Sequence, residues 1–240
     1  MIRAVLFDLD DTLYEQAAWL RGAWLAVATR AAAWGIDPSA MERALTHVAG
    51  AGSDRGGIID NALTLVGATR VPVAPLVACF RSYTPTSLDP YPGVADALAR
   101  LATRCPLGLV SDGEPAGQRA KLAALGLERH FSVVVWSDEL GRAHRKPDPL
   151  PFRLALGRLD VAAGDAVYIG DRPSKDVAGP AAIGMRAIRV RTGEWRDDPD
   201  DKRCWTSVDT VLDAVEHCER ADEPRIEVGA VAAASPRLTA

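Results

Sequence analysis

The stretch VLFDLDDT, residues 5–12, decides how the rest of the chain is interpreted. It joins a short apolar run, typical of a buried strand, to a turn that carries Asp8 and Asp10. Side chains two residues apart on an extended segment point the same way, so both carboxylates should project beyond the strand's carboxyl end. Two carboxylates this close repel each other unless a cation or a shared proton compensates. A solvated acidic turn is the alternative interpretation of this motif alone.

Four further apolar runs predict that this strand belongs to a parallel sheet. Each run is short and nearly continuous in its apolarity, as is typical of strands buried on both faces. Helical patterns lie between the later runs, and this alternation predicts an α/β fold with a Rossmann-like, doubly wound parallel sheet. The expected strands are 4–7, 107–111, 133–136, 166–169 and 187–190, and the expected helices are 92–103, 118–125, 151–159 and 176–183, the last shortened by Pro180.

A long helical segment separates the first expected strand from the second. Apolar residues such as Trp19, Ala23 and Val27 recur on one face of it. After Val215 the helical periodicity fades, and the end of the chain resembles a frayed tail. We therefore expect a helical insertion at 15–87, an α/β core made of 1–14 and 88–222, and a flexible tail at 223–240. The candidate hinges are the junctions at 14–15 and 88–92.

Polar side chains follow the other expected strands at corresponding places. Ser111 follows the second strand, Lys146 follows the third, and Asp171 and Asp176 follow the fourth. In open α/β sheets, ligands bind outside the carboxyl ends of the strands. The order acid pair, hydroxyl, lysine, acid pair therefore predicts one site at one edge of the sheet.

The order of these motifs resembles that of the haloacid dehalogenase-like hydrolases. DLDDT matches the first family motif, Ser111 the second, Lys146 the third, and GDRPSKD at 170–176 the fourth. The resemblance covers residue 3 to about residue 191 and makes the helical insertion similar to a C1-type cap. It implies an enzyme, a phosphatase of the family that uses Mg²⁺ and an aspartyl-phosphate.

The same resemblance implies a role for each acidic residue. Asp8 would be the nucleophile and a metal ligand, and Asp171 the third protein ligand. Asp10 would offer its backbone carbonyl to the metal, while its side chain serves as general acid and then as base. Asp176 would hold water at the metal or orient Lys146. An oxygen-only ligand set of this kind suits Mg²⁺.

Phosphate binding is assigned to the second and third motifs. Ser111 and Lys146 would bind the transferring phosphoryl oxygens, together with backbone N–H groups around Leu9 and Asp112. Many relatives carry Asn at the position of Asp112. We expect catalysis to survive this difference, because the backbone amide performs much of the work there.

Composition and charge exclude several other classes of protein. The 240 residues carry 28 Lys and Arg against 32 Asp and Glu, a formal charge of −4, so a nucleic-acid binder driven by bulk positive charge is excluded. No apolar run approaches the ~20 residues that span a bilayer. The four cysteines are widely spaced and indicate reduced thiols in the cytoplasm, not a disulfide frame or zinc site.

The expected partner is a small soluble phosphorylated metabolite, with no nucleic acid and no membrane. A phosphomutase on the same scaffold is an alternative, as is a binding or regulatory protein without catalysis. The second alternative predicts a lost nucleophile or metal ligand, whereas Asp8, Asp10, Lys146 and Asp171 are all present. The identity of the substrate and the oligomeric state are not encoded in any motif of this sequence.

Overall fold

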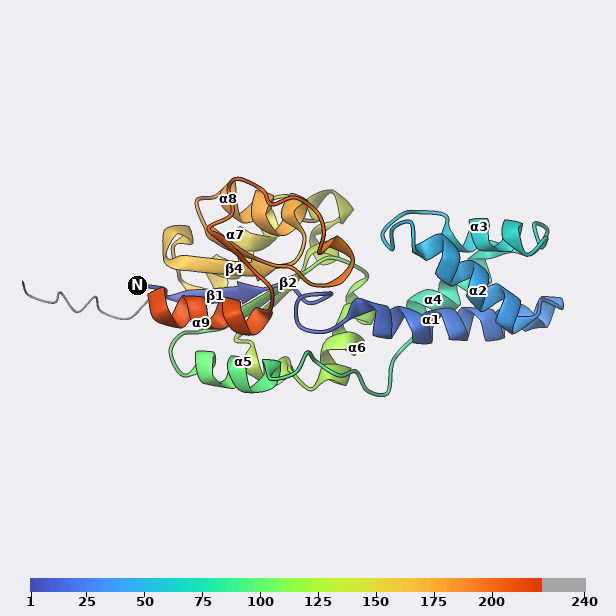
Figure 1. Cartoon of the computed structure of the whole chain (residues 1–240), viewed down its shortest axis with the longest axis horizontal. Helices are drawn as coiled ribbons and strands as arrows, with labels where there is room; N and C mark the ends of the chain where they lie inside the picture. The colour runs from blue at the N-terminus through green and yellow to red at the C-terminus, as the bar shows by residue number, and fades with distance from the viewer. Residues whose placement is uncertain (222–240) are drawn as a thin grey trace, which may run out of the picture.

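The computed structural model describes residues 1–221. Its centre is a parallel sheet of six strands in the order β3-β2-β1-β4-β5-β6. This order and the helices on both faces confirm the Rossmann-like, doubly wound α/β fold (Figure 1). The strands are β1 Ala4–Phe7, β2 Leu107–Ser111, β3 Val133–Trp136, β4 Ala166–Gly170, β5 Arg186–Val190 and β6 Thr206–Val208.

The alternation of side chains along β1 divides the core into two apolar layers. Val5 and Phe7 pack with residues of α5, α6 and α9 on one face of the sheet. Ala4 and Leu6 pack with residues of α7 on the other face. Figure 1 shows the same division, with α5 and α9 on one side of β1 and α7 and α8 on the other. These helices are α5 Val94–Ala102, α6 Pro115–Leu125, α7 Leu150–Leu159, α8 Ala178–Ala181 and α9 Val211–Ala221.

The register of the three central strands brings their carboxyl ends into line. Phe7 is paired with Leu109 of β2 and with Ile169 of β4. The next residue, Asp8, continues this alignment, and its N–H donates to the carbonyl of Ile169 at 2.9 Å. The polar residues that follow β1, β2 and β4 therefore begin at the same edge of the sheet.

Four α-helices form a second body beyond that edge (Figure 1). They have an apolar cluster of their own, which includes Trp24, Met41 and Leu63. The two segments that join them to the sheet lie side by side, because Tyr91 N–H donates to the carbonyl of Leu13 at 2.9 Å. We call these helices the cap, and the limits 15–87 remain a prediction. The cap helices are α1 Gln16–Ala31, α2 Pro38–Ala49, α3 Ile58–Leu65 and α4 Val73–Ser82.

Three expectations about the elements need correction. Strand β6 was not expected, because a half-buried strand of three residues leaves no apolar run in the sequence. The prediction that helical periodicity ends after Val215 was wrong, because Cys218 continues the buried face of α9. The expected helix 176–183 begins instead as a π turn over Pro173–Val177 and ends as the short α8, which contains Pro180. The expected tail at 223–240 lies outside the described residues.

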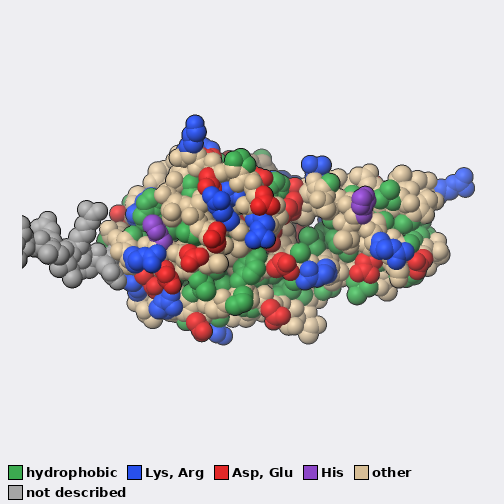
Figure 2. Space-filling model, viewed as in Figure 1, with side chains coloured by type: hydrophobic (Ala, Val, Ile, Leu, Met, Phe, Trp, Pro, Cys, Tyr) green, Lys and Arg blue, Asp and Glu red, His purple; other side chains and the backbone are tan. Residues whose placement is uncertain are grey.

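None of the helices among residues 1–221 combines the length and the apolar character needed to cross a bilayer. On the face shown in Figure 2, basic and acidic side chains are interspersed over the core.

Candidate active site

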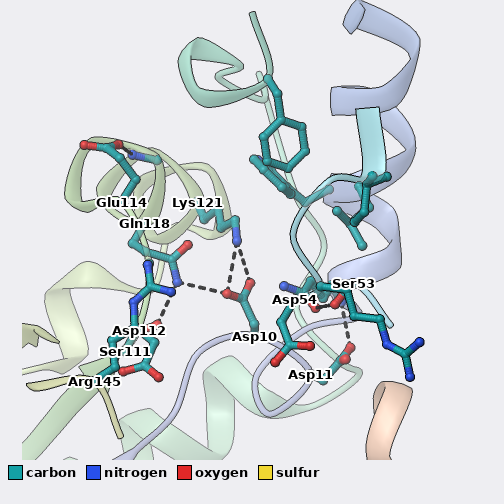
Figure 3. A pocket seen from close by; sticks show the side chains of 18 of the residues that line it. Asp10, Asp11, Ser53, Asp54, Ser111, Asp112, Glu114, Gln118, Lys121 and Arg145 are labelled. Atoms are coloured by element: carbon teal, nitrogen blue, oxygen red, sulfur yellow. Dashed lines mark hydrogen bonds and ion pairs between the residues drawn. The ribbon is translucent and has the colours of Figure 1, made fainter. Parts of the chain in front are cut away.

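A cleft of about 510 Å³ lies between the cap and the carboxyl ends of the strands. The core supplies its acidic floor, and residues of α1, α3, α4 and the loop before α3 supply its cap side. Figure 3 shows part of this cleft, with Asp10 facing Gln118 and Lys121 of α6. All seven side chains predicted from the sequence line this one cleft: Asp8, Asp10, Ser111, Asp112, Lys146, Asp171 and Asp176.

Lys146 bridges two of the predicted carboxylates. Its Nζ lies 2.6 Å from Oδ1 of Asp8 and 2.8 Å from Oδ1 of Asp176, and it donates to the hydroxyl of Tyr168 at 3.1 Å. The lysine is only 4% exposed. Burial opposes its charge, but Asp176 and Asp8 outweigh burial and hold the pKa of Lys146 well above its ordinary value. Lys146 is therefore a fixed cation at the floor of the cleft.

Three buried carboxylates, Asp8, Asp171 and Asp176, form a group that fits a divalent cation. One oxygen from each lies within 4.8 Å of the others. Burial raises the pKa of Asp8 to about 7, although Lys146 opposes the shift. Burial and the neighbouring carboxylates also raise the pKa of Asp171 well above its ordinary value. Three buried carboxyl groups face one ammonium group, so the positive charge of Lys146 does not balance them. Oxygen ligands of this kind suit a hard divalent cation.

Gly170 is required where the fourth-motif loop folds back. A Cβ atom there would lie 2.5 Å from Cβ and Cγ of Asp176. The Asp176 carboxylate also accepts the N–H of Arg172 at 3.0 Å, so one oxygen ties down its own loop while the other holds Lys146. Of the two roles expected for Asp176, contact with Lys146 is visible in the geometry.

The Asp10 carboxylate receives three sets of hydrogen bonds. Lys121 Nζ lies 2.8 and 3.0 Å from its two oxygens, Gln118 Nε2 donates at 2.9 Å, and the Tyr14 hydroxyl donates at 2.5 Å. Burial raises the pKa of Asp10, but the Lys121 charge and these hydrogen bonds outweigh burial and bring it below its ordinary value. The free protein therefore holds Asp10 as a carboxylate.

Sequence reasoning missed the partners of Asp10. Gln118 and Lys121 lie on the inward face of α6, and both are buried, at 3% and 4% exposure. Two polar residues three positions apart on the apolar face of a helix are the signal that was available. The contacts themselves join residues 108 and 111 positions apart, and no local pattern encodes that distance.

The turn after β2 presents Ser111 and Asp112 to the same cleft. The Ser111 hydroxyl accepts from Gln118 Nε2 at 2.7 Å, so Gln118 joins the second motif to Asp10. The Asp112 carboxylate accepts from the Ser137 hydroxyl at 2.6 Å, from the Lys146 N–H at 3.0 Å and from Lys175 Nζ at 3.0 Å. Asp112 therefore joins the loops on this side of the cleft through its side chain, a role that was not expected from the sequence.

Asp11 joins the loop after β1 to the start of the cap. Its backbone lies in the left-handed region, with φ of 57°. Its carboxylate accepts from the N–H of Gln16, the first residue of α1, at 2.9 Å and from the N–H of Glu194 at 3.1 Å. Gly193 is required beside it, because a Cβ atom there would lie 2.0 Å from Asp11 Cγ.

Polar contacts also hold the loop before α3 against the core. Arg172 Nη1 lies 2.6 Å from Oδ2 of Asp54, and the Arg172 guanidinium lies 3.9 Å from the centre of the Trp195 ring. The Ser53 hydroxyl donates to Glu194 at 2.5 Å. The fourth-motif loop, which carries Asp171, thus touches the cap through the very next residue.

A model of the haloacid dehalogenase-like hydrolases matches residues 2–184. A glyceraldehyde 3-phosphate phosphatase of Methanopyrus kandleri is 36% identical over 205 residues, which cover 82% of this chain and 87% of that protein. Among solved structures, a 2-haloacid dehalogenase of Pseudomonas syringae is 28% identical with a TM-score of 0.65, covering 92% of this chain and all of the other. A phosphatase from Thermococcus onnurineus is 26% identical with a TM-score of 0.60, covering 90% of this chain and 98% of the other.

These matches extend across the core motifs and the cap alike. The family model includes every predicted site residue from Asp8 to Asp176. The curated relative, which matches most of both chains, is a phosphatase, so the protein is an enzyme of the phosphatase group. The sequence motifs, the sheet order and the family match agree, and the chain belongs to the haloacid dehalogenase-like hydrolases.

Proposed function

We propose that this protein is a Mg²⁺-dependent hydrolase of small phosphomonoesters that works through an aspartyl-phosphate on Asp8. The observation that carries the proposal is the meeting of Asp8, Lys146 and the Asp171–Asp176 pair at the floor of one cleft. A phosphoryl dianion repels an anionic nucleophile, and phosphate-monoester hydrolysis is among the slowest uncatalysed reactions. A carboxylate attacks it only where fixed positive charge offsets that repulsion.

Mg²⁺ fits the group of buried acids. Asp8 and Asp171 would hold it through carboxylate oxygens and Asp10 through its backbone carbonyl, as the family resemblance implies. When bound, the ion would neutralise charge on the phosphoryl oxygens and on the attacking carboxylate. Asp176 is also within reach, and its bond to Lys146 makes it a support for the cation side of the site.

In the first step, an oxygen of Asp8 forms a bond to phosphorus while the bond to the ester oxygen breaks. Lys146 and the Ser111 hydroxyl are placed to bind the equatorial phosphoryl oxygens, with backbone N–H groups near Leu9 and Asp112. Lys146 also fixes the direction of the nucleophile, since its Nζ already holds one oxygen of Asp8 at 2.6 Å. The other oxygen of Asp8 is left for the attack.

Asp10 serves the leaving oxygen in this step. An alkoxide leaves poorly unless it receives a proton, and Asp10 lies two residues beyond the nucleophile at the same edge of the sheet. Because Lys121 holds Asp10 as a carboxylate in the free protein, the proton that it donates must be taken up when the substrate binds. In the second step Asp10 accepts a proton from the attacking water, phosphate leaves, and Asp8 is restored.

The substrate class follows from the relatives and from the cleft. The curated relative named above acts, by its name, on glyceraldehyde 3-phosphate. A cleft of about 510 Å³ holds a small metabolite. Leu20, Val77 and Phe80 line its cap side, along with Arg55 and Arg81. We propose a small phosphorylated metabolite of this kind as the substrate. The cytoplasmic location of the protein stays a prediction.

A phosphate-release assay on a panel of phosphomonoesters tests the proposal. The panel contains glyceraldehyde 3-phosphate, sugar phosphates, phosphorylated hydroxy acids, nucleoside monophosphates and p-nitrophenyl phosphate. The expected result is release of free phosphate with Mg²⁺, none with EDTA, and none from Asp8→Asn. Chromatography of the products separates hydrolysis from phosphoryl transfer back to the substrate. Isomer formation without free phosphate would establish a mutase and overturn the proposal.

A further inference from the structure

Lys121 is a buried cation that none of the four sequence motifs contains. It comes from the second turn of α6, on the core side of the cleft, and is 4% exposed. Its Nζ lies 2.8 Å from Oδ1 and 3.0 Å from Oδ2 of Asp10, so both oxygens of that carboxylate face one ammonium (Figure 3). Removing an ammonium from water costs free energy, and here the Asp10 carboxylate offsets that cost.

The cap covers the other side of this ammonium. Nζ of Lys121 lies 4.1 Å from the centre of the Trp19 ring, which belongs to the first turn of α1. A cation over an aromatic face is attracted by the ring, and the attraction is stronger where water is excluded. Trp19 itself packs against Phe80 of α4, with ring centres 5.2 Å apart. Lys121 is therefore held between the Asp10 carboxylate and the aromatic layer of the cap.

The surrounding donors leave the Asp10 carboxylate one orientation. Lys121 and Gln118 approach it from α6, and the Tyr14 hydroxyl approaches from the start of the cap linker. Lys121 alone contacts both oxygens, so it fixes the rotation of the carboxylate plane as well as its position. Apolar residues of similar volume often stabilise a fold as well as a buried ion pair does, which makes stability a weak reason for this pair.

We propose that Lys121 is a positioning residue for proton transfer, which acts by holding the Asp10 carboxylate in the orientation that serves the leaving oxygen of the substrate. The inference rests on the proposed phosphatase function and adds to it a residue outside the family motifs. Lys121 touches neither the phosphoryl group nor Asp8 in this assignment. Its effect therefore passes entirely through Asp10.

The assignment predicts a dependence on the leaving group. An alkyl phosphate needs a well-placed proton donor, whereas p-nitrophenolate leaves without one. The kcat/KM of Lys121→Met should fall by about 10²-fold or more on an alkyl phosphate, the size of a typical general-acid contribution. On p-nitrophenyl phosphate the fall should be less than ~10-fold, because kcat/KM covers only the steps through release of the first product.

Four variants test the assignment in one set of assays. They are Lys121→Met, Lys121→Arg, Asp10→Asn and the double variant Lys121→Met/Asp10→Asn. Arg119→Met is the matched control, since Arg119 lies on the same helix but is exposed and pairs with Glu139. Thermal unfolding of each variant reports whether it folds, and Lys121→Arg keeps the buried charge should the methionine variant fail to fold.

The double variant gives the decisive comparison. If Lys121 acts only through Asp10, the double variant is no slower on the alkyl phosphate than Asp10→Asn, and Lys121→Arg recovers part of the loss. Two results would overturn the assignment and leave the proposed phosphatase function intact. One is an equal fall in kcat/KM of Lys121→Met on both substrates, and the other is a double variant whose loss is the product of the two single losses. A wild-type protein that releases no phosphate from any ester would overturn the proposed function, and the role of Lys121 with it.

Discussion

The ammonium nitrogen of Lys175 lies 3.0 Å from Oδ2 of Asp112. This contact joins the fourth-motif loop to the turn after β2, and it explains how the site accommodates Asp112. Compared with an asparagine, the aspartate adds one negative charge beside the proposed phosphate-binding site. Lys175 supplies the matching positive charge, and Lys146 lowers the pKa of Asp112 further against the effect of burial. The extra charge of Asp112 is therefore balanced within the loops.

Replacing Lys175 with methionine should leave the Asp112 carboxylate without this positive charge and so lower the stability of the protein. A partly buried polar group that loses its partner costs about 1–3 kcal/mol, and for a protein of this size each kcal/mol lowers Tm by about 2–4 °C. Adding Asp112→Asn should restore most of the lost Tm, because the amide still accepts from Ser137 and from the Lys146 N–H. Thermal unfolding of the two single variants and the double variant measures this coupling. Independent, additive shifts would contradict it.

Asp8→Asn should abolish turnover while the protein stays folded. An amide is not a competent nucleophile for phosphorus and is a poorer ligand for Mg²⁺ than a carboxylate. EDTA should abolish phosphate release by the wild type, and added Mg²⁺ should restore this activity. Phosphate release measures both effects, and Glu139→Gln, an exposed acid outside the cluster, serves as the control. Full activity of the wild type in metal-free buffer would contradict the proposed dependence on Mg²⁺.

The acid cluster predicts an unusual pH dependence for the metal-free protein. Burial raises the pKa of Asp8 from 3.8 to about 7, so the folded protein holds a proton there that the unfolded chain releases. Because the folded state binds more protons between about pH 4 and 7, the free energy of unfolding falls as pH rises through this window. With EDTA present, chemical unfolding at pH 5 and pH 7.5 should show the lower stability at pH 7.5.

Asp8→Asn is the control for this pH dependence. His130 and His217 have lowered pKa values and act in the opposite direction, since their unfolded forms bind more protons near pH 6. Both histidines remain in the variant, so the difference between wild type and variant removes their contribution. It reports Asp8 together with the effect of Asp8 on the pKa of Asp171. The metal-free variant should be more stable than the wild type at pH 7.5. Equal pH slopes for the two proteins would show that Asp8 titrates normally.

The sequence was sufficient for the features that depend on local pattern. The strand β1 and its neighbours are continuous apolar runs, and the polar residues after them meet because parallel strands end at one edge of a sheet. The same periodicity located the buried face of α1, where Trp19, Ala23 and Val27 lie inside. Asp8, Lys146 and Asp176 could therefore be grouped in one site before their distances were known.

What the sequence could not supply was the set of contacts across the fold. Lys121 meets Asp10 because α6 packs beside the loop after β1, and Lys175 meets Asp112 because two loops lie against each other. A lysine on a helix is usually a solvated surface residue. The spacing of Gln118 and Lys121 on the apolar face of α6 hints that both are buried, but it does not reveal which residue they contact. Such contacts depend on tertiary packing, which the spacing of residues along the chain does not determine.

The cap should open and close, because the ion pair between Asp54 and Arg172 holds it against the core only weakly. Asp54 is 44% exposed in its pair with Arg172, and exposed ion pairs contribute only about 0.2–1 kcal/mol. Asp54→Ala should therefore raise KM by less than ~10-fold, with kcat unchanged or higher where product release limits turnover. Steady-state kinetics measure this effect, and Asp60→Ala, an exposed acid that also lines the cleft, is the control. Structures with and without a phosphate mimic that show one unchanged cap orientation would exclude a moving cap.

The enzyme should release phosphate and not halide, although one structural neighbour is a 2-haloacid dehalogenase. A halide leaves carbon without a proton, whereas an alkoxide needs one to leave phosphorus. The Asp10 carboxyl group therefore has a role in phosphoester hydrolysis but not in dehalogenation. Hydrogen bonds from Lys121, Gln118 and Tyr14 hold that carboxylate in place.

We expect the wild type to release no chloride from 2-chloropropionate. Asp10→Asn should lose about 10²-fold or more in turnover of alkyl phosphates without gaining halide release. An ion-selective electrode and a phosphate assay on the same samples measure both products. Chloride release above the buffer blank, or an Asp10→Asn variant as fast as the wild type on alkyl phosphates, would assign the site to a different reaction.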